Sequence, residues 1–137
     1  MEHRTFDRRT DKAQDLTVIT VTGAVSSESI IAALDDFYES GATSRLLWDF
    51  SAVHGGGITE GGLHRIIESA RRQAHRRTGG KTAIVASSDA QFGVGRMYEI
   101  LSELAGHPIA HAVFRSTAEA VAWLNAADEG ASGAQGP

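Results

Sequence analysis

Apolar and polar positions follow two different periods along the chain, and their succession predicts strands that alternate with helices. Residues 16–22 alternate and are rich in β-branched side chains, which predicts a strand that ends at Gly23. A shorter strand at residues 5–9 is expected to pair with it as a hairpin, across a turn at residues 11–15. Further strands are expected at residues 45–50, 82–86 and 109–114.

Between these strands, apolar residues recur at helical spacing. A first helix is expected to start at Ser26 or Ser27 and end at Gly41, and a second to close at Gly79-Gly80. Cap patterns open two more helices, namely Ser88 with Gln91 and Ser116 with Glu119. The positions expected to face the core are Ile30, Ile31, Leu34 and Phe37, then Leu63, Ile66, Ile67, Ala70 and Ala74, then Val94, Met97, Leu101 and Leu104, and finally Val121 and Leu124.

The predicted order is β-β-α-β-α-β-α-β-α, which belongs to the α/β class. Repeated strand-helix units imply parallel strands, so we expect a mixed, mostly parallel five-stranded sheet with an antiparallel start, packed with four helices. A chain of 137 residues suffices for one such domain, expected at residues 1–126. The small, polar, glycine-rich stretch at residues 127–137 is expected to be a disordered tail.

Composition narrows the function. The formal net charge of −4 argues against a nucleic-acid partner, and no apolar run approaches the roughly 20 residues of a membrane helix. We therefore expect no membrane insertion and, since the chain has no cysteine, a cytoplasmic location. Neither a cofactor nor a metal is expected: His107 and His111 are four apart, but Pro108 prevents the helix that would align them as ligands.

Several segments resemble the STAS domain, the fold of anti-sigma-factor antagonists. The resemblance rests on residues 47–53, where an aspartate and a small residue precede a valine, on Gly23 after the second strand, and on residues 92–97 and 114–124. It covers nearly all of the first 126 residues. It implies the STAS-like fold and a regulatory, non-enzymatic role in binding a protein partner.

The chain departs from the family at the start of the second helix. Antagonists of this family carry Asp-Ser-Ser-Gly or a variant there, and a kinase partner phosphorylates the serine. This chain has Thr59-Glu60-Gly61-Gly62, so a glycine stands at the phosphoserine position. Thr59 is the remaining hydroxyl of this loop and is the candidate for phosphorylation near a helix amino terminus, although a role as a helix cap explains it adequately.

The segment His54-Gly55-Gly56-Gly57 matches the oxyanion-hole motif of some esterases, but no Gly-x-Ser-x-Gly nucleophile motif accompanies it. A phosphate-binding loop would need lysine after its second glycine, and Gly61 is followed by Gly62. The glycines are better explained as a tight loop between strand and helix. The sequence therefore predicts that the chain is not an enzyme.

Loops that follow parallel strands meet at one edge of the sheet, which gives a candidate binding site. Its residues are His54, Gly55, Gly56, Gly57, Thr59, Ser87, Ser88 and Arg115. Arg72 and Arg76 on the second helix form either a solvated face or a docking surface for an acidic partner.

Our first hypothesis is a regulatory domain that binds a protein partner through the glycine-rich loop and second helix. The alternative is a carrier or sensor of a small apolar or anionic ligand, and a homodimer is left open. An enclosed apolar pocket of a few hundred Å³ would favour the ligand, because binding sites usually have that size, whereas a flat, convex surface would favour the partner.

Overall fold

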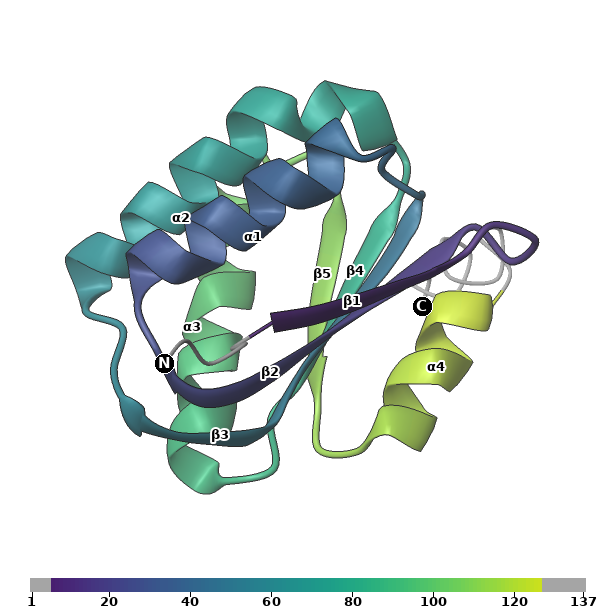
Figure 1. The fold of residues 1–137 in the computed structure, drawn as a ribbon. Coiled ribbons are helices and arrows are strands. Elements are labelled where there is room, and N and C mark those ends of the chain that lie inside the picture. Colours follow the sequence, from purple (N-terminus) through teal and green to yellow (C-terminus); the bar gives the residue numbers. More distant parts are fainter. Residues whose placement is uncertain (1–5, 127–137) are drawn as a thin grey trace, which may run out of the picture.

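Five strands form one sheet in the computed structural model, which describes residues 6–126. β1 (Phe6–Asp11) pairs antiparallel with β2 (Leu16–Val25), and β3 (Arg45–Gly56), β4 (Lys81–Val85) and β5 (Ala110–Phe114) follow in parallel (Figure 1). The strands lie side by side in the order in which they occur in the chain. The predicted mixed, mostly parallel sheet is thereby confirmed. The expected tail at residues 127–137 lies outside the described residues.

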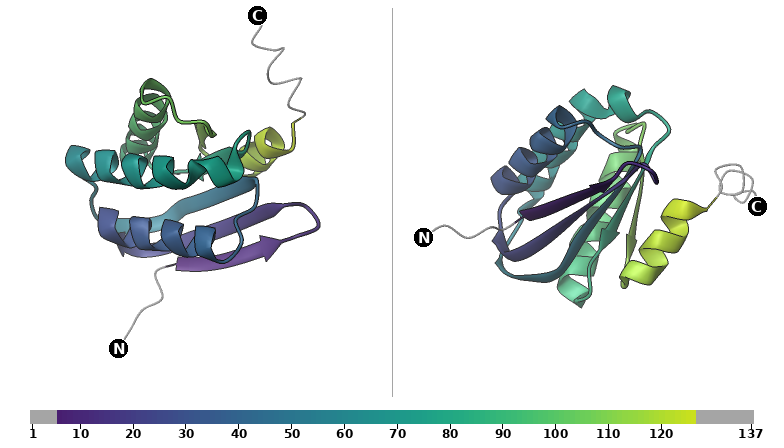
Figure 2. Two further views of the ribbon diagram at one scale, coloured as in Figure 1. Left: turned by 90° about the horizontal axis from the view of Figure 1, so that it is seen from above. Right: turned by 45° about the vertical axis from the view of Figure 1, so that its right-hand side comes forward.

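Four α-helices pack on the sheet, as predicted. α1 (Ser27–Glu39), α2 (Glu60–Gln73) and α3 (Asp89–Leu104) lie on one face, and α4 (Thr117–Asn125) lies on the other (Figure 2). A short 3₁₀ helix, η1 (Ala74–Arg77), extends α2. Crossovers between parallel strands are right-handed, and these strands advance in one direction, so the three connecting helices share a face.

Each α-helix begins at a hydroxyl side chain that accepts a hydrogen bond from a backbone N–H three residues later. Such caps satisfy donors that have no partner within the helix. Ser26, Ser88 and Ser116 confirm the predicted starts, and Ser27 is the first helical residue rather than the cap. The four cap distances are 3.1 Å for Ser26, 2.9 Å for Thr59, 3.1 Å for Ser88 and 3.2 Å for Ser116.

The middle of each central strand, at residues 46–48 of β3 and 83–85 of β4, is apolar on both sides because helices cover both faces of the sheet. In β3, Leu46 and Trp48 join the core under α1 and α2, whereas Leu47 between them joins the core under α4. This alternation is the pleat of a strand, whose successive side chains point to opposite faces. The two cores explain why this strand appears in the sequence as a continuous apolar run.

The predicted inner face of α3 is wrong. Val94, Met97 and Leu104 are 39%, 46% and 78% exposed, and the buried residues of the helix are Gly95 and Ser102. A Cβ on Gly95 would lie 2.7 Å from Cγ2 of Val113 on β5. Small residues therefore let α3 approach the sheet closely, and its large apolar residues lie elsewhere on the helix.

The predicted ends of two strands were also wrong. β2 continues through Gly23 to Val25 rather than ending at Gly23, and β3 continues past Phe50 to Gly56. Their pairing persists across two register shifts, and Gly23 adopts a φ of +76°, which glycine tolerates without strain. His54, Gly55 and Gly56 thus belong to a strand, and the loop before α2 is limited to residues 57–59.

Candidate functional site

A cavity of about 330 Å³, half open to solvent, lies between the sheet and the three helices on one of its faces, toward the carboxyl ends of the strands. α1, α2 and α3 contribute its walls together with β2, β3 and β4, and the segment after β3 contributes Gly57 and Ile58. Its volume falls within the range of small-molecule sites, at the lower end. Characteristic wall residues are Leu34, Trp48, Ile66, Ile84, Val94 and Tyr98.

The cavity walls carry no charged side chain among the described residues. Their polar side chains come from Ser88, Gln91 and Tyr98. Gln91 donates from Nε2 to the Val53 carbonyl at 2.7 Å, while its Oε1 is buried and has no hydrogen-bond partner within residues 6–126. Burial raises the pKa of the Tyr98 phenol well above its usual range, so this wall stays neutral.

Only part of the predicted site reaches this cavity. Gly57 and Ser88 line it, whereas His54, Ser87 and Arg115 do not. Arg115 instead binds Asp89 at 2.8 Å and the Ser87 carbonyl at 3.3 Å, with its guanidinium 4.2 Å from the Phe92 ring centre. These contacts join β5 to the start of α3, so the predicted anion site has its one arginine already paired.

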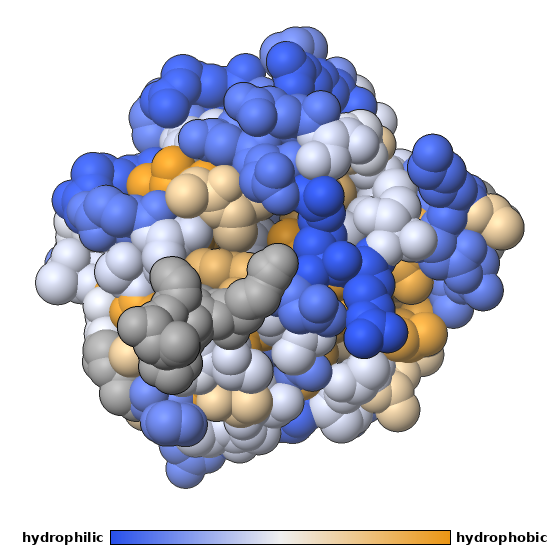
Figure 3. Space-filling model, in the orientation of Figure 1, coloured by the Kyte–Doolittle hydropathy of each residue, from blue (hydrophilic) through white to orange (hydrophobic). Residues whose placement is uncertain are grey.

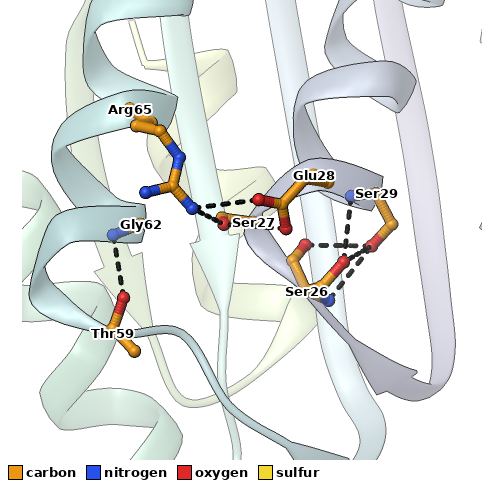
Figure 4. A network of polar contacts seen from close by, with 7 residues as sticks. All are labelled: Ser26, Ser27, Glu28, Ser29, Thr59, Gly62 and Arg65. Atoms are coloured by element: carbon orange, nitrogen blue, oxygen red, sulfur yellow. Dashed lines mark hydrogen bonds and ion pairs between the residues drawn. The ribbon is translucent and has the colours of Figure 1, made fainter.

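The amino-terminal ends of α1 and α2 meet in a polar network (Figure 4). Arg65 on α2 donates to Ser27 at 2.8 Å and pairs with Glu28 at 3.0 Å. Hydrogen bonds from its own backbone N–H and from Ser27 lower the pKa of Glu28. A Cβ on Gly62 would lie 3.0 Å from Ser27, so a glycine here lets the two helices approach. The network holds the start of α2 against the start of α1, and α2 is part of the surface on which we expected a partner.

The predicted basic surface is divided between two elements. Arg72 lies exposed on α2, but Arg76 lies on η1 and was wrongly placed on the second helix. Arg76 reaches the Tyr38 carbonyl of α1 at 3.4 Å. Hydrophilic residues dominate the surface over α1 and α2, with apolar residues in small patches (Figure 3). The docking role of Arg72 and Arg76 stays a prediction.

No protein-family model matches the chain, and no curated protein matches it in sequence. Solved structures do match in fold. An uncharacterised protein with a SpoIIAA-like fold from Shewanella loihica PV-4 has a TM-score of 0.54 at 14% identity, covering 90% of this chain and 98% of that one. The anti-sigma factor antagonist SpoIIAA in its unphosphorylated form has a TM-score of 0.53 at 15% identity, with coverages of 85% and 94%. The chain has the SpoIIAA-like fold.

Two neighbouring glycines at the start of α2, Gly61 and Gly62, differ in the space around them. A Cβ on Gly61 would meet no atom nearer than 3.9 Å, whereas Gly62 is buried against α1. Thr59 is exposed, and its Oγ1 accepts the capping bond from Gly62. Its phosphorylation stays a prediction.

Within residues 6–126, no three His, Cys, Asp or Glu side chains gather as a metal site would require. None of the helices in this described part combines the length and apolar character needed to cross a bilayer.

The sequence did not point to several residues that define the cavity. Gln91 was expected only as a cap partner, yet its side chain connects α3 to β3. Trp48 and Tyr98 gave no signal that distinguishes a cavity wall from ordinary core. A cavity is the space left between packed side chains, and a one-dimensional pattern does not record it.

Two histidines, His107 and His111, form a row of ring contacts that ends at Tyr98. The His111 ring contacts Tyr98 at a centroid distance of 5.2 Å and His107 at 4.6 Å. His107 Nε2 and His111 Nδ1 are buried without a hydrogen-bond partner in the described residues. Burial, reinforced by the nearby charge of Arg77, lowers the pKa of His107 to about 4 and that of His111 to about 3.

This pair predicts acid sensitivity. Both pKa values lie below the ordinary 6.5. Between about pH 6.5 and about pH 4 the unfolded chain therefore binds protons that the folded chain does not, and the free energy of unfolding falls as the pH falls. The well-buried His111 contributes a slope of about 1.4 kcal/mol per pH unit in that window, and the half-buried His107 contributes less because solvent screens it.

Urea denaturation at a series of pH values measures this slope. The variant His111→Phe keeps an aromatic ring and removes one titrating group, so its slope between pH 6 and pH 5 should be about 1.4 kcal/mol per unit smaller than that of the wild type. Equal slopes in the two proteins would contradict this assignment.

Proposed function

We propose that this chain is a non-catalytic regulatory domain that carries or senses a small neutral apolar ligand in its cavity. The observation that carries the proposal is the apolar cavity of about 330 Å³ itself. Small-molecule sites usually have this size and an apolar lining. Transfer of an apolar ligand from water into such a site is favourable.

The cavity chemistry selects a neutral ligand over an anionic one. A carboxylate or phosphate inside would be desolvated without any cation among the described lining residues. One polar group on the ligand has a partner in Ser88, which lines the cavity and whose hydroxyl can accept a hydrogen bond, whereas Gln91 Oε1 is buried away from the accessible space. The favoured class is therefore an apolar molecule that carries a single hydroxyl or N–H donor.

The proposal includes a protein partner that binds beside the ligand. Gly57 and Ile58 line the cavity and lead directly into Thr59 and α2. Ligand in the cavity and a partner on this loop would thus contact the same short segment. Support for a partner comes from the shared fold, since one solved structure of this fold is an anti-sigma factor antagonist.

Binding of N-phenyl-1-naphthylamine, a neutral fluorophore, tests the ligand. We expect saturable fluorescence enhancement with one probe per chain, because the probe matches the cavity in polarity. At about pH 8, where carboxylates are ionised, 1-decanol should displace it and decanoate should compete at least about tenfold less well.

Two tryptophan variants on β3 locate the bound probe. Val53 lines the cavity, whereas its neighbour Ala52 is exposed and does not. Val53→Trp should fill the space and weaken probe binding at least about tenfold, and Ala52→Trp should leave it unchanged. Equal binding by both variants would place the probe on the surface and refute the cavity as the site.

A further inference from the structure

α3 carries an apolar face that no described element covers. Met97, Ile100 and Leu104 are 46%, 47% and 78% exposed, and together with Val94 they are the exposed large hydrophobic residues of the described chain. Isolated exposed apolar residues are normal, but four on one helix are not. We call Gly93, Met97, Ile100 and Leu104 the outer face of α3.

The outer face points away from the protein's own core. At 100° per residue, Met97, Ile100 and Leu104 fall within one narrow sector, directly opposite the buried Gly95 and Ser102. α3 is the last helix in the row formed with α1 and α2 (Figure 2). α3 thus packs on the sheet through small residues on one side and presents large apolar residues on the opposite side, which leaves that side free for a second partner.

The outer face has the spacing of a helix-pairing seam. Its residues at 93, 97, 100 and 104 are separated by four, three and four positions, which is the a/d pattern of paired helices. Arg96 and Glu103 flank the seam on one side, one helical repeat of seven residues apart. They carry opposite charges at equivalent positions of the repeat.

We propose that the outer face of α3 pairs with α3 of a second copy of this chain, antiparallel, about a two-fold axis. Antiparallel pairing brings equivalent flanking positions of the two helices together, so Arg96 of each copy, which also pairs with Glu99 of its own helix at 3.0 Å, meets Glu103 of the other. A parallel pair gives no such match. The charges therefore select both the occupant, a second copy, and its direction.

The shape of the outer face agrees with this register. Antiparallel packing about the middle of the seam places Leu104, its most exposed residue, against Gly93 of the other copy. A Cβ on Gly93 would meet no atom of residues 6–126 within 4 Å, so no packing within this part of the chain requires the glycine. It leaves room for the large side chain of the partner copy. One 16-residue helix per copy makes a small interface, so we expect a weak dimer that dissociates at about micromolar concentration or above.

Sedimentation equilibrium of the full chain, from low micromolar to near millimolar concentration, tests the proposal. The wild type should shift from monomer to dimer. Arg96→Glu and Glu103→Arg should each weaken the dimer at least about tenfold, since each places like charges in contact. The double variant Arg96→Glu with Glu103→Arg should regain the wild-type dissociation constant, because the pairs are re-formed with reversed sign.

Gly93→Gln separates pairing from folding. Glutamine favours helix over glycine by up to about 1 kcal/mol, so the variant monomer should melt at no lower temperature than the wild type. The dimer should be lost, because the glutamine side chain takes the space that Leu104 of the other copy needs. A wild type that stays monomeric over the whole concentration range would refute the proposal. Binding of phosphatidylcholine vesicles by that monomer would instead indicate that the outer face contacts a membrane. Failure of the double variant to regain pairing would refute the antiparallel arrangement. Neither outcome depends on the cavity or its ligand.

Discussion

Replacing Arg77 with methionine should lower the free energy of unfolding by about 3 kcal/mol or more. Arg77 is 5% exposed and donates to the Thr43 carbonyl at 2.7 Å and to the Ser44 and Lys81 carbonyls at 3.0 Å each. It also donates to Thr82 Oγ1 at 3.1 Å. Methionine fills the volume but leaves these acceptors buried without that donor, which costs about 1–3 kcal/mol for each that finds no other partner.

Urea denaturation followed by circular dichroism measures the loss, and two variants define its cause. Arg76→Met, at the exposed neighbouring position, should change stability by less than about 0.5 kcal/mol. Arg77→Lys keeps the charge but not the planar fork of donors, so it should also be clearly destabilised. An Arg77→Met protein within about 1 kcal/mol of the wild type would show that water replaces the guanidinium at low cost.

Gly80→Ala should destabilise the protein by about 3 kcal/mol. Gly80 is buried just before β4, and a Cβ there would lie 2.4 Å from the Ser44 carbonyl oxygen and 2.9 Å from that of Arg77. Both obstacles are backbone atoms. Ser44 cannot move aside without stretching its hydrogen bond from Lys81, which is 3.0 Å long and leads β4 into its place beside β3.

Gly61→Ala is the matched control for this substitution. A Cβ on Gly61 would meet only side-chain atoms, at 3.9 and 4.0 Å, and the residue lies within α2. Alanine favours helix over glycine by about 1 kcal/mol, so this variant should be slightly more stable than the wild type. Thermal denaturation of both variants compares them directly, and equal melting temperatures would contradict the steric account.

Much of the fold was predictable because local signals agreed with one another. Strand runs, helical spacing and hydroxyl caps at Ser26, Ser88 and Ser116 all indicated the same order of elements. α3 was oriented wrongly because periodicity gives weight to large apolar residues, whereas this helix packs through Gly95 and Ser102. Its large residues lie partly on the cavity and partly on the surface.

The candidate site was predictable only in its location. Parallel topology directs the loops to one edge, and Gly57 and Ser88 do reach the cavity there. Arg77 resembled its exposed neighbours in sequence, and nothing local marks which arginine of a basic run turns inward. The extension of β3 through His54 depends on bulges in its pairing with β2, which a sequence rich in glycine conceals.

The agreement between spatial order and chain order has a consequence for how the protein folds during synthesis. Each strand that leaves the ribosome adds to the exposed edge of the sheet already formed, and none has to insert between two earlier strands. Connections are therefore short-range, which favours rapid folding. The sheet face that carries Leu47 and Val85 nevertheless stays uncovered until Leu124 of α4 emerges. A nascent chain is therefore most exposed to aggregation before α4 has emerged from the ribosome.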